Sequence, residues 1–274
     1  MCEKKFDEIM LVSDLDGTLL NSKCELSKEN IDAIKYFVEN GGKFTIATGR
    51  AEFGVAPYTS KLSINIPGIL YNGALAYDFQ SDRPLWDDCL EDDVEDVVDN
   101  LLDIFPDMGV EVFHRGQVYC VRECEETEKH SKKEEFIPHY VPLNMVPKPW
   151  YKIILAWKPE KLVEVERQLE GVTGSFRSVY SEPQFLELLG KRVSKGNALR
   201  MLVEKLGLKM KNVVSIGDNL NDRELIEMAG VGFAVDNAHG ELKKAADYSC
   251  CHHDSHAAAE VINWIEQNLE IFGR

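Results

Sequence analysis

The sequence lacks the features that mark membrane proteins, secreted proteins and disulfide-stabilised domains. No apolar run in its 274 residues approaches the ~20 residues that span a bilayer. The first residues mix acidic and basic side chains where a secretory signal has an uninterrupted apolar core. Seven cysteines, an odd number scattered over a long chain, do not form a disulfide framework. We therefore expect a cytoplasmic protein with no membrane partner.

Basic residues are also outnumbered by acidic ones. The chain has 31 basic and 47 acidic residues, which gives a formal net charge of −16. Such a surface repels phosphate backbones, and this excludes a general nucleic-acid binder. Any anionic ligand must instead be held by a local positive device, such as a metal ion or a helix N-terminus.

What remains is the composition of an ordered globular protein. Hydrophobic residues make up 44% of the chain and charged residues 28%, close to the averages for soluble domains. A length of 274 residues is well above that of one ordinary domain, so two compact units are expected.

The first part of the chain alternates between strand and helix patterns. An apolar run at 8–13 has the length of a strand. Apolar residues then recur at helical spacing from Ile31 to Val38, with Ser27 as the candidate N-cap. A second apolar strand follows at 43–47. A strand, a helix and a strand at this spacing predict a parallel sheet with helices on its faces.

The same alternation returns near the other end of the chain, with a strand at 213–217 and a last helix at about 257–268. The middle differs, because two strands joined at Arg115-Gly116 read as a hairpin and 138–149 reads as a loop. We therefore predict an α/β protein with a Rossmann-like parallel-sheet core and an inserted α+β domain. The predicted bounds are 1–82 and 188–274 for the core and 83–187 for the insertion.

Acidic residues follow two of the predicted core strands. Asp14 and Asp16 lie where the first strand ends, and Asp218 and Asp222 follow strand 213–217. An Asp-Gly pair after a strand is also ordinary turn chemistry. If the two strands are neighbours, however, their carboxylates converge at one edge of the sheet. Such a group needs a hard divalent cation, and oxygen ligands favour Mg²⁺.

Two further segments suit a phosphate group. Thr48-Gly49-Arg50 closes the second strand with a hydroxyl, a glycine that permits close approach and a guanidinium. Lys195 follows Ser194 at the start of a predicted helix, where backbone N–H groups already favour an anion. A lysine at a helix start is more often solvated. Lys195 is therefore a candidate phosphate ligand only in combination with the acidic groups and Thr48-Gly49-Arg50.

Together these segments resemble the four ordered motifs of the haloacid dehalogenase-like phosphohydrolase superfamily. The match covers most of 8–79 and 188–248. Tyr71-Asn72-Gly73-Ala74 and the size of the insertion resemble the Cof-like sugar-phosphatase branch, in which the insertion is a cap domain. The four motifs are Asp14-Leu15-Asp16-Gly17-Thr18-Leu19, Thr48-Gly49-Arg50, Lys195-Gly196 and Gly217-Asp218-Asn219-Leu220-Asn221-Asp222.

The resemblance implies a role for each carboxylate. Asp14 is the nucleophile that forms an aspartyl-phosphate, and Asp16 protonates the leaving alkoxide and then activates water. Mg²⁺ would be held by the Asp14 carboxylate, the Asp16 backbone carbonyl and Asp218, with Asp222 in support. The phosphoryl oxygens would be held by Thr48, Gly49, Lys195 and Asn221, and the rest of the substrate would face Arg50 and Asn72.

The expected function is hydrolysis of small phosphorylated metabolites, with sugar phosphates as the preferred candidate substrates. Asp16 favours a phosphatase or a phosphomutase, because an ion-pumping relative carries Thr there and keeps its phosphoenzyme. A phosphomannomutase-like activity stays open, and so does a non-catalytic sugar-phosphate sensor, although a sensor has no need of an acid/base. The expected partner is a small-molecule phosphate ester, and we expect a monomer or weak homodimer.

One segment departs from the family pattern. Cys250-Cys251-His252-His253-Asp254-Ser255-His256 contains soft metal ligands, whereas Cof-like relatives usually have an Asp-Gly-Val turn there. Adjacent residues of an extended chain point in opposite directions, and no second Cys/His pair lies at zinc-finger spacing. We therefore expect an exposed loop and leave open whether it binds a metal.

Overall fold

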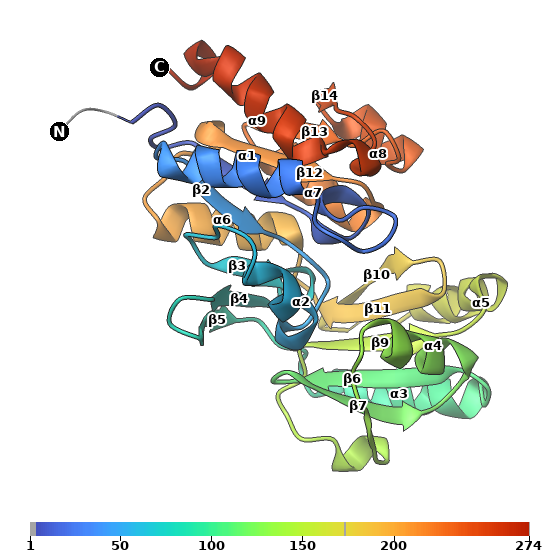
Figure 1. Ribbon diagram of the computed structural model, residues 1–274. Coiled ribbons are helices and arrows are strands. Elements are labelled where there is room, and N and C mark those ends of the chain that lie inside the picture. Colours follow the sequence, from blue (N-terminus) through green and yellow to red (C-terminus); the bar gives the residue numbers. More distant parts are fainter. Residues whose placement is uncertain (1–3, 173, 274) are drawn as a thin grey trace. The chain divides into compact units, whose positions relative to one another are not determined.

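The structure is a computed structural model that describes residues 4–172 and 174–273 (Figure 1). The described chain divides into two compact units. One unit contains 4–50, 55–86 and 194–273, and the other contains 51–54 and 87–193. Among these residues, no helix combines the length and the apolar character that crossing a membrane requires.

A five-stranded parallel sheet forms the centre of the first unit, with the strand order β14-β13-β12-β1-β2. A three-stranded sheet of order β3-β4-β5 follows in sequence, and a parallel bridge between Ala47 and Ile69 connects it to the end of β2. The bounds are β1 Met10–Ser13, β2 Lys43–Ile46, β3 Gly68–Leu70, β4 Leu75–Asp78, β5 Arg83–Asp87, β12 Val213–Gly217, β13 Val231–Ala234 and β14 Tyr248–Ser249.

Helices cover the parallel sheet. Met10 and Val12, which share one face of β1, pack against Leu199 and Leu202 of α6 in an apolar cluster. Helices α1 and α9 pack against each other. The bounds are α1 Lys28–Glu39, α6 Lys195–Lys205, α7 Arg223–Met228, α8 Gly240–Ala245 and α9 Ala257–Gln267. Helix α2, Glu52–Thr59, contains residues of both units.

The second unit is built on a six-stranded sheet of order β10-β11-β9-β6-β7-β8, antiparallel except for the pair β7 and β8. Apolar residues of α3 and α5 pack on one face of it. Helix α4 lies against β6. The bounds are β6 Gly109–His114, β7 Gln117–Arg122, β8 His139–Tyr140, β9 Lys152–Ala156, β10 Phe176–Glu182, β11 Phe185–Gly190, α3 Asp93–Ile104, α4 Glu125–Lys133 and α5 Pro159–Glu170.

The predicted fold class is confirmed, as a parallel-sheet α/β core with an additional antiparallel region. Ser27 caps α1 as expected, because its side chain accepts a hydrogen bond from the Asn30 backbone N at 3.2 Å. The hairpin at Arg115-Gly116 joins β6 to β7. The loop expected at 138–149 contains the short strand β8 and one helical turn, Leu143–Met145.

Helix α4 was not expected from the sequence. Its nine residues are charged or polar, and only Thr127 and His130 are buried. The sequence therefore has no apolar periodicity there, and this periodicity is the signal by which a helix is recognised. The helix is instead held by a polar contact, because the His130 imidazole hydrogen-bonds Glu111 of β6.

Candidate active site

The candidate site lies at the carboxyl ends of three adjacent strands of the first unit. Strand β1 pairs in parallel with both β12 and β2. Asp14 follows β1 directly, Asp218 follows β12, and Thr48 lies two residues beyond β2. The Asp14 backbone N donates to the Ile216 carbonyl at 2.9 Å, which extends the β1–β12 pairing to Asp14. The strands expected to be neighbours are therefore neighbours, and their polar side chains meet.

The turn after Asp14 is shaped by one glycine. Gly17 has a φ of +73°, and a Cβ there would lie 2.5 Å from Oδ2 of Asp218. This position therefore excludes a side chain both by conformation and by space. The next residue, Thr18, donates from its hydroxyl to Oδ1 of Asp218 at 3.0 Å. The turn thus brings the first motif against the last one and orients the Asp218 carboxylate.

Lys195 occupies the centre of the cluster. It is the first residue of α6, and its side chain is only 1% exposed. Its Nζ lies 2.6 Å from Oδ1 of Asp14 and 2.6 Å from Oδ1 of Asp222. The backbone at Gly73 packs closely against the start of α6. A Cβ on Gly73 would lie 2.3 Å from the Ser194 carbonyl oxygen.

Asp222 has a positioning role in this arrangement. It is fully buried, and one of its carboxylate oxygens accepts from Lys195. The other oxygen accepts from the backbone N of Asp218 at 3.0 Å and from that of Asn219 at 3.1 Å. Asp222 therefore orders both the lysine and the loop that carries Asp218.

The electrostatics of the cluster are those of crowded acidic groups around one cation. Burial raises the pKa of Asp14 well above its ordinary value, and Asp222 and Asp218 raise it further, while Lys195 acts in the opposite direction. Burial and the charge of Asp222 likewise raise the pKa of Asp218 to about 7. Burial alone would lower the pKa of Lys195, but Asp14 and Asp222 outweigh it and raise that pKa.

These donors suit a hard divalent cation. Asp14, Asp218 and Asp222 can each place one carboxylate oxygen within 4.8 Å of the others. Three acidic groups face a single ammonium group, so a divalent ion would offset the excess of negative charge. Asp222 already accepts from Lys195 and from two backbone N–H groups. Asp14 and Asp218 are therefore the better placed ligands.

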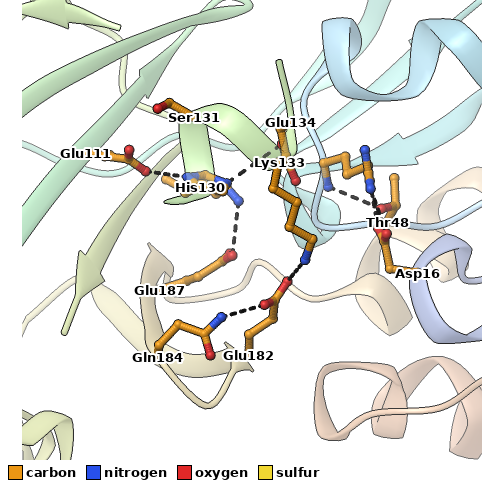
Figure 2. Close-up of polar contacts among 12 residues, drawn as sticks. Asp16, Thr48, Glu111, His130, Ser131, Lys133, Glu134, Glu182, Gln184 and Glu187 are labelled. Atoms are coloured by element: carbon orange, nitrogen blue, oxygen red, sulfur yellow. Dashed lines mark hydrogen bonds and ion pairs between the residues drawn. The ribbon is translucent and has the colours of Figure 1, made fainter. Parts of the chain in front are cut away.

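Asp16 is paired with Arg50 in this structure. Nε of Arg50 lies 2.7 Å from one Asp16 carboxylate oxygen, and its Nη2 lies 2.7 Å from the other (dashed lines at Asp16 and Thr48 in Figure 2). The Thr48 hydroxyl accepts from the Arg50 backbone N at 3.2 Å. The Arg50 side chain is 8% exposed and that of Asp16 is 41% exposed. A residue expected to face the substrate thus binds the expected acid/base.

The remaining predicted residues form a second group beside the strand ends. The Asn72 backbone N donates to the Thr48 carbonyl at 2.9 Å. The Asn221 side-chain amide donates to Oδ1 of Asn72 at 3.0 Å. Gly49 lies against the same amide, since a Cβ there would be 3.1 Å from Nδ2 of Asn72. The structure therefore gathers Thr48, Gly49, Asn72 and Asn221 in one place.

Two residues at the site were missed by the sequence reasoning. Thr18 lies within the first motif, and only the fold shows that its hydroxyl reaches Asp218. Asn237 donates from its side-chain amide to the Gly17 carbonyl at 2.7 Å. No motif marks Asn237, which follows strand β13 in the first unit. Its position next to the sheet edge was the one available signal.

Comparisons with known proteins identify relatives of the whole chain. A family model described as haloacid dehalogenase-like hydrolase matches residues 11–262. The Bacillus subtilis (strain 168) protein named "Putative phosphatase YxeH" is 32% identical over 263 residues, 93% of this chain and 97% of that protein. Phosphatase YwpJ of the same strain is 27% identical over 280 residues, 92% and 98%. A crystal structure of a haloacid dehalogenase-like hydrolase from Bacteroides thetaiotaomicron superposes with a TM-score of 0.83 at 28% identity, covering 94% of this chain and 99% of that one.

Proposed function

Because the chain belongs to the haloacid dehalogenase-like hydrolase family, we propose that it is a Mg²⁺-dependent phosphatase of small phosphorylated metabolites, sugar phosphates first. The observation that carries the proposal is the setting of Asp14. This carboxylate is buried at the end of a central strand, with Lys195 on one oxygen and Asp218 nearby. A nucleophile in such a setting can be aimed at a phosphorus atom, and phosphoryl transfer depends mainly on positioning and charge neutralisation.

In the first step, a carboxylate oxygen of Asp14 attacks the phosphorus of the ester. The new Asp14 oxygen–phosphorus bond forms while the bond from phosphorus to the leaving oxygen breaks, and Asp16 gives that oxygen its proton. The products of this step are the free alcohol and an aspartyl-phosphate at residue 14. Lys195 already contacts Asp14 and would neutralise charge on the phosphoryl oxygens.

In the second step, Asp16 has become a carboxylate and takes a proton from a water molecule. The water oxygen bonds to phosphorus, the bond to Asp14 breaks, and inorganic phosphate leaves. Asp16 must part from Arg50 to serve in either step. Its carboxylate is 41% exposed, so the side chain has room to do so.

The resident cation of this proposal is Mg²⁺, held by the carboxylates of Asp14 and Asp218 and by the Asp16 backbone carbonyl. When bound, Mg²⁺ neutralises charge on the transferring phosphoryl group. Asp222 supports the site by holding Lys195 and the loop that carries Asp218. Thr48, Gly49 and Asn221 are proposed to bind the phosphoryl oxygens.

The preference for a sugar phosphate rests on the resemblance of 71–74 to the Cof-like sugar-phosphatase branch. Asn72 in that segment is 2% exposed and is held by both Thr48 and Asn221. Its amide is therefore part of an ordered polar group that can bind hydroxyl or phosphoryl oxygens. Arg50 is the proposed second substrate contact. The proposal includes a cytoplasmic location and a monomer or weak homodimer.

Release of inorganic phosphate tests the proposal directly. The protein is incubated with a panel of sugar phosphates and nucleotides, in Mg²⁺, in Ca²⁺ and in EDTA. We expect release in Mg²⁺ only, because Ca²⁺ tolerates a looser geometry than phosphoryl transfer allows. The Asp14→Asn variant is the control and should release none.

Other outcomes point to other functions. Conversion between phosphosugar isomers that needs a bisphosphate activator and frees no phosphate would indicate a mutase. Tight binding of a sugar phosphate without turnover in Mg²⁺ would indicate a sensor. Equal phosphate release in Mg²⁺ and EDTA would contradict the role of the metal.

A further inference from the structure

The segment that departs from the family pattern folds into a compact turn in the first unit. His253–Ser255 forms one turn of 3₁₀ helix, and His256 follows in the left-handed conformation with a φ of +69°. The chain is therefore not extended here, and adjacent side chains are not forced to opposite sides. His252, His253 and Asp254 can each place one ligand atom within 4.8 Å of the others.

The His253 imidazole is oriented by the backbone. Its Nδ1 lies 2.7 Å from the Leu20 carbonyl oxygen, which can only accept, so Nδ1 carries the proton. The other nitrogen, Nε2, lies 3.3 Å from the Ser22 hydroxyl, and it is the atom that can bind a metal ion when the imidazole is neutral. A carbonyl bonded to one imidazole nitrogen is the arrangement that commonly orients a histidine ligand toward a metal.

The Asp254 carboxylate is also held in place from outside the turn. One oxygen accepts from the Ser22 backbone N at 2.7 Å, and the other accepts from the Ser22 hydroxyl at 2.7 Å. Two carboxylate oxygens have about four lone-pair positions between them, so room remains for a cation. Ser22 thus orients the Asp254 carboxylate and leaves lone pairs on that carboxylate that can bind a cation.

The third donor, His252, completes the group. Its Nδ1 accepts from the Asp254 backbone N at 3.2 Å and lies 3.5 Å from Asp254 Oδ2. Two ligands on one tetrahedral zinc ion are about 3.3 Å apart, given bonds of about 2.0–2.1 Å. The side chains of His252 and Asp254 are 41% and 45% exposed, so rotation can bring the remaining pairs to that distance.

We propose that His252, His253 and Asp254 form a second metal site, for a transition-metal ion of the zinc class. Two imidazoles and one carboxylate are ligands typical of Zn²⁺, Co²⁺ or Ni²⁺ and are poor ligands for Mg²⁺. The nearby thiols do not belong to the ligand set. Cys250 is buried, and Cys251 directs its Sγ to the Ser255 carbonyl at 3.1 Å. Three protein ligands leave further positions for water.

The proposed zinc-class site is connected to the candidate active site through one residue. Asn237 accepts from the His253 backbone N at 3.0 Å and donates to the Gly17 carbonyl at 2.7 Å. Gly17 in turn lies against Asp218. The site is nevertheless built from a different set of side chains, so its occupancy can be measured with the acidic cluster removed.

The test is metal binding by the full chain in the Asp14→Asn/Asp218→Asn background. Zn²⁺ chloride is titrated by calorimetry, and the melting temperature is followed with and without Zn²⁺. We expect one equivalent of Zn²⁺ to bind and to raise the melting temperature, because a ligand of the native state stabilises it. Mg²⁺ chloride should do neither. Co²⁺ chloride should give visible d–d absorption without a thiolate charge-transfer band.

Matched variants assign the ligands. His253→Gln and, separately, His252→Gln should each weaken Zn²⁺ binding by more than ~10²-fold, and Ser22→Ala, which removes only an orienting group, by ~10–100-fold. His139→Gln, at an exposed histidine of the second unit, should change nothing. Zn²⁺ binding that survives both His252 and His253 substitutions, or a Co²⁺–thiolate band, would overturn the assignment. Absence of Zn²⁺ binding in the folded parent would also overturn it.

Discussion

Lys195 determines the charge balance of the candidate active site. It is buried between Asp14 and Asp222, and Asp218 lies close by. Removing one partner of a buried ion pair leaves an uncompensated charge in a poorly solvated place, and the cost is larger than the worth of the pair. We therefore expect the lysine to contribute to stability as well as to the proposed phosphate binding.

We predict that Lys195→Met lowers both activity and stability. Without the ammonium group, turnover should fall by ~10²-fold or more. The free energy of unfolding in EDTA should fall by about 3–5 kcal/mol, the usual loss when a buried pair is broken. Mg²⁺ should restore part of that stability, because it offsets the same negative charge. Urea unfolding with and without Mg²⁺ measures this, and Lys205→Met, at an exposed position of α6, is the control.

Asp16 presents a different situation, because its charge is exposed on one side and held by Arg50 on the other. Both oxygens of this carboxylate accept hydrogen bonds from the Arg50 guanidinium in this structure. Its proposed roles as acid and base therefore belong to a state in which the pair has opened. Kinetics can separate these roles from a merely structural one.

We predict that Asp16→Asn discriminates between leaving groups. A sugar alkoxide needs a proton to leave, whereas p-nitrophenolate leaves without one. Phosphorylation of Asp14 by a sugar phosphate should slow by ~10²-fold or more, while phosphorylation by p-nitrophenyl phosphate persists. The measurement is the pre-steady-state burst of each alcohol, with Asp236→Asn as a control at an exposed carboxylate. Equal loss in both bursts would remove the acid/base assignment.

At the scale of elements, the position of α6 decides where Lys195 lies. Ser194 caps the helix by accepting from the Asn197 backbone N at 3.1 Å. The turn Tyr71–Gly73 packs against the same residue, and Gly73 has a φ of +108°. The helix start and the turn thus meet backbone to backbone, which leaves no room for a side chain.

We predict that Gly73→Ala displaces the start of α6. The new Cβ would lie 2.3 Å from the Ser194 carbonyl, and backbone atoms cannot rotate away as a flexible side chain can. The left-handed conformation adds about 1–2 kcal/mol for a residue with a Cβ. Thermal unfolding should show a loss of at least that size, together with reduced phosphatase turnover. Gly240→Ala, where nothing lies within 4 Å of the added Cβ, should leave both unchanged.

Across the molecule as a whole, buried ionisable groups are found in both units, and in the first unit Lys195 lies between Asp14 and Asp222. The second unit contains ionisable side chains that are almost completely buried in its sheet region. His130 donates from Nδ1 to a Glu111 carboxylate oxygen at 2.6 Å (Figure 2). Lys152 pairs with Glu187 at 3.0 Å. Burial lowers the pKa of His130, but the hydrogen bond and charge of Glu111 outweigh it and raise that pKa to about 9.

We predict that the stability of the second unit falls at alkaline pH. The folded-state pKa of His130 is raised above the unfolded value of about 6.5, so its contribution is complete below about pH 6.5 and is lost as pH rises through about 9. The free energy of unfolding that His130 contributes below about pH 6.5, relative to pH values above 9, amounts to about 3 kcal/mol. Urea unfolding at several pH values, followed by a probe in the second unit, measures it.

The His130→Gln variant isolates this contribution from other groups that titrate in the same range. It should be less stable than the parent near pH 6, and the two should converge near pH 10. His139→Gln, at an exposed histidine of the same unit, should keep the pH dependence of the parent. Parallel pH profiles for the parent and the His130→Gln variant would show that folding does not raise the pKa of His130.

The elements whose signals are local can be predicted from the amino-acid sequence alone. The strand before Asp14, the cap at Ser27 and the hairpin at Arg115-Gly116 follow from apolar spacing, side-chain capping and turn chemistry within a few residues. The sequence also indicates that acidic groups follow strands β1 and β12, because each group comes directly after its strand in the chain.

Which of these groups come into contact depends on the folded chain and could not be predicted from local patterns. Lys195 contacts Asp14 across 181 positions of sequence, and Asn221 contacts Asn72 across 149. Contacts between segments far apart in the sequence also produce three other features. They are the Asp16–Arg50 pair, the contact of the polar helix α4 with Glu111, and the hydrogen bond that orients the His253 imidazole. Such contacts leave no periodic trace in the sequence, because a side chain's partner, burial and charge state are set by whatever the folded backbone places beside it.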